Sequence, residues 1–222
     1  MNIDVNTARL LGTAQLLVFA ASLVSERLLV SAVGTGPGAA RLENVSKNLT
    51  RLRISNLVAL GNCIAIIFLG AVFYFVFYQP YQLIALVAFG FFAAEAVILA
   101  AGQLGTLALV PASQEFATAG APSDSHLPAL GDLLYEGLNR RAYDIHMVFF
   151  CLGGILWYYL LYTSRVLPVA LSLWGLIAIC LLTVPVWAVL YNRELTQTLI
   201  LGLPYAPFEL VLGLWLLVIG FQ

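Results

Sequence analysis

Glu95 is the one charged residue between Ile54 and Gln114, and it lies inside the apolar stretch GFFAAEAVILAAG, residues 90–102. An ionised carboxylate costs several kcal/mol or more in hydrocarbon, so we expect this side chain to face protein, a partner or water. There it could donate or accept a proton, or contact a ligand. The alternative is a structural role, in which the acid bonds to a neighbouring helix.

Three more ionisable residues lie at the ends of apolar segments. Glu209 follows Pro207 closely, so we place it in the first turn of the last helix, where free backbone N–H groups could instead hold it as a capping acid. Asp144 and His146 open the fourth apolar segment and point about 200° apart on a helix, so they do not form a local pair. Histidine as a residue type ordinarily titrates near neutral pH, although a lone histidine often serves only as a structural donor. Glu95, His146 and Glu209 are therefore candidate catalytic residues, and Asp144 is a candidate ligand contact.

The composition indicates the surroundings in which these residues work. Of the 222 residues, 62% are hydrophobic and 9% are charged, and the mean hydropathy is +0.96. Soluble domains carry about 25% charged residues, because their surfaces face water. The sequence therefore predicts an all-α, polytopic membrane helix bundle, with membrane lipids as its immediate surroundings. A net charge of -1 and the absence of a dense basic tract give no indication of a nucleic-acid partner.

Other kinds of site have little support in the sequence. Cys63, Cys151 and Cys180 lie singly in apolar runs, without a CxxC motif. The scattered acids and the histidine lack the spacing of a zinc site, and there is no GxSxG motif, P-loop or Gly-rich dinucleotide turn. We therefore predict neither a metal nor a cofactor.

Six segments are long and apolar enough to cross the bilayer, which takes about 20 helical residues. They lie at about 8–33, 52–78, 83–110, 142–162, 166–191 and 205–222, and we assign them to a single integral membrane domain, 1–222. The breaks between them contain GTGPGAA (34–40), QPYQ (79–82), a long loop from Pro111 to about Leu127, and TSRVLP (163–168). Segments 127–138 and 192–204 are typical of short interfacial helices.

This topology places the polar residues relative to one another. Glu95 lies about 20 Å of helix rise beyond Gln82, near the middle of the bilayer. Asn56 and Gln103 fall in the same half of the membrane as Glu209 and His146. We therefore predict a polar vestibule there with Glu95 at its floor, and Asn62 could reach that floor as a hydrogen-bond partner. Asn56, Asn62 and Gln103 are candidate ligand-binding residues.

The basic residues give conflicting indications of orientation. Two lie on the side of the termini, Arg9 and Arg165, whereas eight lie on the side of loops one, three and five: Arg27, Arg41, Lys47, Arg51, Arg53, Arg140, Arg141 and Arg193. The positive-inside rule then puts the odd loops in the cytoplasm. However, several of the eight are accompanied by acids in loop one and could pack within the protein.

The succession of segments resembles a known family. Five segments are similar, in this order, to a prokaryotic membrane family catalogued as domain of unknown function 4386: ARLLGTAQLLVFAASLV, LENVSKNLTRLRISNLVALGNCIAIIFLGAVFYFVF, YQLIALVAFGFFAAEAVIL, YDIHMVFFCLGGILWYYLLYTSRVLPVALSLWGLIA and LPYAPFELVLGLWLLVIGF. The resemblance implies a six-helix bundle in the cytoplasmic membrane of a prokaryote, and no established reaction. It points to Glu95, Glu209, Asp144 and His146. Family members often carry basic residues before the first span and in loops two and four, which implies an N-terminus inside, whereas YQPYQ here has none.

Three functions remain open at this point. In the first, an intramembrane polar pocket binds or protonates a small apolar or lipid-derived molecule, with Glu95 as acid or base and His146 and Glu209 relaying protons. In the second, the chain is an accessory subunit that packs against other membrane protein subunits. The third is a small transporter or sensor. An inward Glu95 at a cavity would favour the first, and an outward Glu95 the second.

Overall fold

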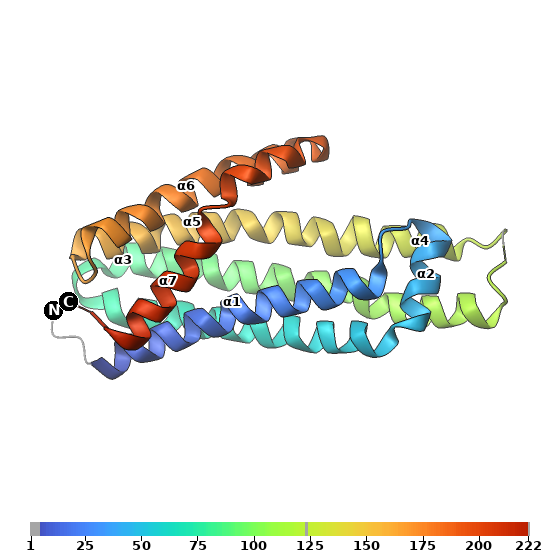
Figure 1. Cartoon of the computed structure of the whole chain (residues 1–222), viewed down its shortest axis with the longest axis horizontal. Helices are drawn as coiled ribbons and strands as arrows, with labels where there is room; N and C mark the ends of the chain where they lie inside the picture. Colours follow the sequence, from blue (N-terminus) through green and yellow to red (C-terminus); the bar gives the residue numbers. More distant parts are fainter. Residues whose placement is uncertain (1–4, 123, 222) are drawn as a thin grey trace. The chain divides into compact units, whose positions relative to one another are not determined.

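The computed structural model describes residues 5–122 and 124–221, and throughout these ranges the regular structure is helical (Figure 1). The helices are α1 (Val5–Val33), α2 (Gly38–Lys47), α3 (Leu49–Thr118), α4 (Leu127–Asp132), the π-helical segment η1 (Leu133–Arg140), α5 (Arg141–Ser164), α6 (Val169–Tyr191), the 3₁₀-helical segment η2 (Arg193–Gly202) and α7 (Tyr205–Val218). The prediction of an all-α protein is confirmed.

Six helical stretches in the described residues are long and apolar enough to cross a membrane, as predicted: Val5–Val33, Leu49–Gln79, Tyr81–Thr118, Leu127–Ser164, Val169–Tyr191 and Ile200–Val218. The predicted break at 34–40 is also present, because α1 ends at Val33 and α2 begins at Gly38. The chain is therefore a membrane-embedded helix bundle.

The second and third spans belong to one helical element, α3, which is interrupted at Tyr81 by a non-helical backbone (φ -138°, ψ 38°). Gly70 lies against Phe89, and the rings of Tyr74 and Phe89 have centroids 6.2 Å apart. Contacts between residues at equal distances on either side of residues 79–81 are those of an antiparallel helical pair. The tight reversal predicted at QPYQ is confirmed.

The predicted loop from Pro111 to Leu127 is wrong over its first half, because α3 continues through Pro111 to Thr118. Ala112 and Phe116, which is only 1% exposed, face inward there and pack in a buried apolar cluster with Leu109. Tertiary packing of this face outweighs the disfavour that Pro111 brings to a helix.

The two segments predicted as interfacial helices are both helical. Residues 127–138 join the fourth span without a break, through the π-helical segment η1. This helix of 38 residues would be roughly 57 Å long at the α-helical rise, against a hydrocarbon core of about 30 Å. The helix is therefore longer than one crossing of the hydrocarbon requires. The segment after α6 forms η2, which packs against α6 (Figure 1).

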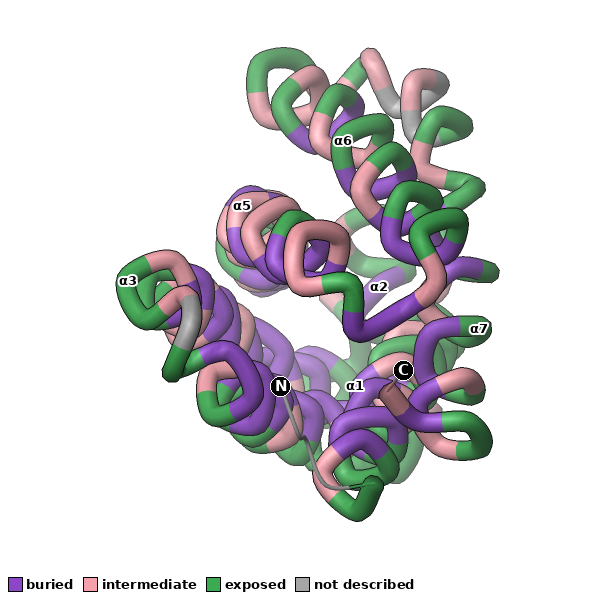
Figure 2. The backbone as a smooth tube through the Cα atoms, turned by 90° about the vertical axis from the view of Figure 1, so that its left-hand side faces the viewer, coloured by how far each residue is buried: buried purple, intermediate pink, exposed green. Residues whose placement is uncertain are grey.

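Contacts divide the chain into two compact units. The first unit comprises Met1–Phe19, Ile64–Val97 and Asp144–Gln222, and the second comprises Ala20–Cys63 and Ile98–Tyr143. In Figure 2, buried and exposed positions alternate along the coils of α6, so that this helix of the first unit presents one face to its neighbours and another outward.

The second unit contains α2, a helix that the sequence analysis did not predict. Leu42 and Val45 are fully buried on one of its faces. The side chain of Arg41 donates to Asp132 (2.5 Å) and Glu136 (2.9 Å), and its guanidinium lies 4.5 Å from the ring centre of Tyr135. Arg140 pairs with Glu26 in the same unit through two N–H groups, at 2.8 and 2.7 Å. These ion pairs explain part of the excess of basic residues on this side of the chain.

Candidate functional site

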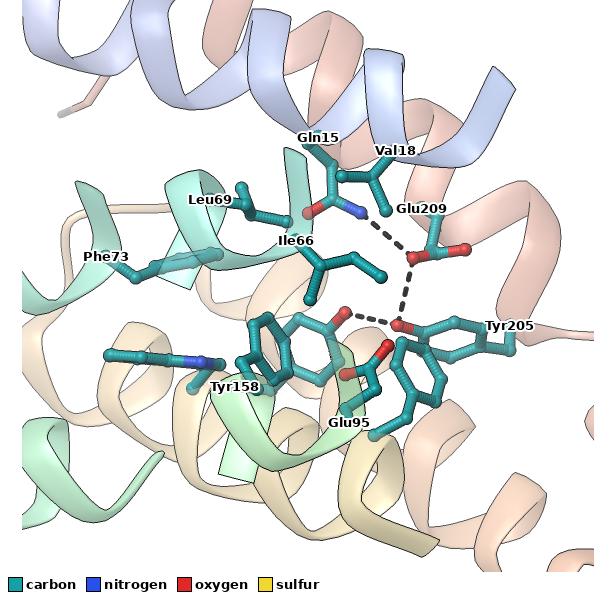
Figure 3. Close-up of a pocket in the computed structure, with 12 residues that line it drawn as sticks. Gln15, Val18, Ile66, Leu69, Phe73, Glu95, Tyr158, Tyr205 and Glu209 are labelled. Carbon is teal, nitrogen blue, oxygen red and sulfur yellow. Dashed lines mark hydrogen bonds between the residues drawn. The ribbon is translucent and has the colours of Figure 1, made fainter. Parts of the chain in front are cut away.

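A small pocket lies within the first compact unit (Figure 3). Five polar side chains line it: Gln15 from α1, Glu95 from α3, Tyr158 from α5, and Tyr205 and Glu209 from α7. The other walls are apolar and consist of Val18, Ile66, Leu69, Phe73, Phe92, Phe150 and Trp157. The cavity has a volume of about 10 Å³, which is near the lower limit for one water molecule.

Glu95 projects into this pocket, where its carboxyl group lies beside Tyr158 and Tyr205 (Figure 3). The residue is 4% exposed. Among the described residues, its Oε2 has no hydrogen-bond partner. Buried polar atoms are nearly always paired, so an unpaired carboxyl oxygen needs an explanation such as a ligand or a catalytic role. The indole N–H of Trp157, another lining residue, is buried without a partner as well.

Glu209 is held by a chain of hydrogen bonds, which Figure 3 shows as dashed lines. Its Oε1 accepts from Gln15 Nε2 at 2.9 Å and from the Tyr205 hydroxyl at 3.2 Å. The hydroxyl oxygens of Tyr205 and Tyr158 are 2.6 Å apart. A tyrosine has one hydroxyl hydrogen, so Tyr205, which donates to Glu209, accepts the hydrogen of Tyr158.

The contact between α1 and α7 that brings Gln15 to Glu209 depends on two glycines. A Cβ atom on Gly12 would lie 2.6 Å from the backbone nitrogen of Leu217 and 2.7 Å from the carbonyl oxygen of Gly213. Small residues allow membrane helices to approach closely. Gln15 is one helical turn from Gly12, and Glu209 is one turn from Gly213, so the close contact sets the register of the polar pair.

The aromatic walls form one connected chain of ring contacts. In order, the ring centroids are 4.9 Å apart for Phe73 and Trp157, 6.1 Å for Trp157 and Phe92, 6.5 Å for Phe92 and Phe150, 5.3 Å for Phe150 and Tyr205, and 6.2 Å for Tyr205 and Tyr158. These spacings are those of favourable aromatic pairs. The pocket therefore has a packed aromatic lining, with its polar groups grouped at Glu95 and Glu209.

The sequence placed Glu209 in the first turn of the last helix, and this is wrong. α7 begins at Tyr205, so Pro207 is its third residue and Glu209 its fifth. Proline is tolerated at Pro207 because the first backbone N–H groups of a helix have no intrahelical partner. Glu209 consequently contacts side chains of the pocket and does not cap the helix.

Asp144 and His146 belong to the same unit but are not among the twelve described residues that line the pocket. Asp144 Oδ2 accepts from Arg193 Nε at 3.2 Å and Nη2 at 2.8 Å, which joins the start of α5 to η2. His146 is buried on α5.

The three candidate amides lie in the second unit. Asn56 Oδ1 accepts from the hydroxyl of Thr106 at 2.7 Å, and this hydroxyl lies 3.4 Å from Gln103 Oε1, so Asn56 and Gln103 meet at Thr106. Asn62 Nδ2 donates to Ser22 Oγ at 3.0 Å. All three amide residues are buried in the unit.

Three of the five polar residues of the pocket were not predicted from the sequence: Gln15, Tyr158 and Tyr205. Gln15 is an isolated amide inside an apolar span, and the argument that singled out Glu95 applies to it as well. Tyr158 and Tyr205 carry no comparable signal, because tyrosines are frequent near both ends of membrane helices.

In the part of the chain that the structure describes, no group of three His, Cys, Asp or Glu side chains could hold a metal ion. The arrangement of the pocket suits proton exchange or hydrogen bonding with a bound molecule. Glu95 is the group placed for either role, because its Oε2 has no hydrogen-bond partner among the described residues.

Comparison with known proteins gives a family and no named relative. No curated protein and no solved structure matches the sequence. The family model described as a domain of unknown function (DUF4386) matches residues 10–220, nearly the whole chain, and the protein therefore belongs to that family.

Proposed function

We propose that the protein is an intramembrane binding protein whose pocket holds a small lipophilic molecule by a polar group placed against Glu95. The observation that carries the proposal is the unpaired Oε2 of Glu95, a residue that is 4% exposed and whose carboxyl group projects into a cavity. Such an atom loses hydrogen bonding to water without gaining a protein partner, and a ligand would supply the partner. We place the protein in the cytoplasmic membrane of a prokaryote, surrounded by lipid.

The position of Glu95 favours this function over that of an accessory subunit. An accessory subunit would use a membrane carboxyl group to meet a polar group of its partner, which requires the side chain to lie on the outer face of the unit. Glu95 lies inside, next to Tyr158, Tyr205 and Glu209. The cavity of about 10 Å³ takes only the polar end of a ligand. Its apolar part would displace aromatic side chains of the pocket wall.

Mass spectrometry tests the proposal directly. The full-length chain is purified in a mild detergent, and organic extracts are compared for the wild type, Glu95→Gln and Glu115→Gln. Glu115 is an exposed residue of the same helix, so its substitution is a matched control. We expect a lipophilic compound that accompanies the wild type and Glu115→Gln and is depleted at least tenfold from Glu95→Gln. Equal recovery from all three variants would refute the proposal.

A further inference from the structure

The chemical character of the pocket indicates the class of molecule that it binds. Two of the twelve lining residues are acids, Glu95 and Glu209, and none of the twelve, all in the described part of the chain, is basic. In a site that excludes water, a carboxyl group stays uncharged unless a positive partner balances its charge. Glu209 accepts hydrogen bonds from the uncharged groups of Gln15 and Tyr205, and Oε2 of Glu95 has no hydrogen-bond partner among the residues that the structure describes. A ligand that is itself positively charged would supply what the pocket lacks.

The aromatic lining favours the same class. Six of the twelve lining residues have aromatic rings: Phe73, Phe92, Phe150, Trp157, Tyr158 and Tyr205. Aromatic faces carry negative charge density and attract ammonium groups within about 6 Å, and more strongly where water is excluded. A pocket with carboxyl groups at one place and aromatic rings around them is the arrangement that recognises organic cations. An anionic ligand would meet repulsion from both features.

The cavity volume selects among organic cations. Without rearrangement of its walls, a space of about 10 Å³ takes a group no larger than a water molecule. A primary ammonium group has one heavy atom and three N–H donors, so it matches this size and can reach Glu95 Oε2. A trimethylammonium group has three additional carbon atoms and no donor. The polar end of the ligand should therefore be a primary ammonium.

From these three features we infer that the pocket binds a lipophilic primary amine in its protonated form, with the ammonium group on Glu95 and the aromatic rings around it. This inference rests on the proposed function and adds the class of ligand. Glu95 would be the direct ionic contact. Glu209, held by Gln15 and Tyr205, would be the second carboxyl group of the site.

Four probes with the same ten-carbon chain separate the possibilities: decylamine, decanol, decanoate and decyltrimethylammonium. Apparent dissociation constants for the full-length protein in dodecyl maltoside micelles follow from the rise of Tm with probe concentration. Decanol is the closest competitor of decylamine, because its hydroxyl group can donate to Glu95 Oε2 and accept from the unpaired N–H of Trp157. The proteins are the wild type, Glu95→Gln and the exposed control Glu115→Gln.

We expect decylamine to bind the wild type and Glu115→Gln at least tenfold more tightly than each of the other three probes. In Glu95→Gln this preference should fall below twofold. If decanol or decanoate binds as tightly as decylamine and still depends on Glu95, the inference is wrong and the proposed pocket function stands. If no probe depends on Glu95, the inference fails, and unchanged recovery of copurified compounds from Glu95→Gln would refute the pocket function as well.

A second variant keeps the inference open to refutation if Glu95→Gln does not fold. Phe150→Leu removes one ring that lines the pocket and contacts Tyr205. It should weaken binding of decylamine about threefold or more and leave binding of decanol within twofold, because only the cation interacts with the face of the ring. Equal weakening of both probes would contradict the cationic assignment.

Discussion

Gln15 Nε2 donates to Glu209 Oε1 across 2.9 Å, and this bond joins residues that are 194 positions apart in the sequence. It connects the first long helix, α1, with the last, α7, at the place where Gly12 and Gly213 bring the two backbones together. The same carboxyl oxygen accepts from Tyr205, which in turn bonds Tyr158 of α5. Three helices of the first unit therefore meet at one acid.

The bond between Gln15 and Glu209 should show as a coupling in a double-mutant cycle. Gln15→Leu, Glu209→Leu and the double variant are unfolded in mixed micelles, and the free energies of unfolding are compared. We expect a coupling between about 0.6 and 1.7 kcal/mol, which are the average and the maximum found for hydrogen bonds between membrane helices. As a control, Gln15→Leu is combined with Thr163→Val, because the hydroxyl of Thr163 donates to carbonyl oxygens of its own helix, those of Tyr159 and Leu160. Additive effects in the first cycle would argue against the bond.

The two glutamates of the pocket should respond in opposite ways to replacement by methionine, which has a similar volume. Glu95→Met removes a buried oxygen without a partner, so we expect the free energy of unfolding to rise by about 1 kcal/mol. Glu209→Met leaves the donors of Gln15 and Tyr205 unpaired, so we expect it to fall by about 1–3 kcal/mol. The exposed control Glu115→Met should stay within about 0.5 kcal/mol of the wild type.

This comparison also separates a functional Glu95 from a structural one. If Glu95 served only to bond a neighbouring helix, Glu95→Met would destabilise the protein as Glu209→Met does. A rise in stability with loss of the copurified compound would instead be the pattern of a residue that is retained for binding at a cost to the fold.

Hydropathy was sufficient to predict the six spans, because each is a long apolar run and the bilayer demands little more of the sequence. It could not predict α2, whose sequence GAARLENVSK is polar on average. This helix is tied to its unit by Arg41, which reaches Asp132 and Glu136 more than 90 positions later. Local periodicity contains no information about such a partner.

Depth in the membrane was enough to select Glu95 as a candidate, because a lone carboxyl group in an apolar run must face protein, a partner or water. The identity of its neighbours depends on helix packing. Tyr158 and Tyr205 line the pocket because of the way α5 and α7 are turned about their own axes. Close contacts at glycines, such as that of Gly12 with α7, help to set these orientations. Phe73 illustrates the same limit, since the aromatic run around it is typical of a membrane interface, yet Phe73 is buried and lines the pocket.

The ion pairs of Arg41 should stabilise the second unit far more than the exposed pair between Lys47 and Glu43, which are 3.6 Å apart. The side chain of Arg41 is 6% exposed and that of Lys47 is 71% exposed. We expect Arg41→Met to lower the free energy of unfolding by about 1–3 kcal/mol, since two acids and the ring of Tyr135 lose their cation. Lys47→Met should cost about 1 kcal/mol or less. Similar effects of the two substitutions would contradict this ranking.

Gly12→Ala should disrupt the pocket from a distance, because the added methyl group meets backbone atoms of α7 that cannot move aside. Overpacking of this kind costs about 1–3 kcal/mol, against a gain of up to about 1 kcal/mol from replacing glycine in a helix. Gly90→Ala is the matched control on α3, since nothing lies within 4 Å of its added Cβ. We expect Gly12→Ala to lower Tm and to reduce recovery of the copurified compound, and Gly90→Ala to do neither. If Gly12→Ala left both unchanged, the close contact of α1 and α7 would not be what holds Gln15 against Glu209.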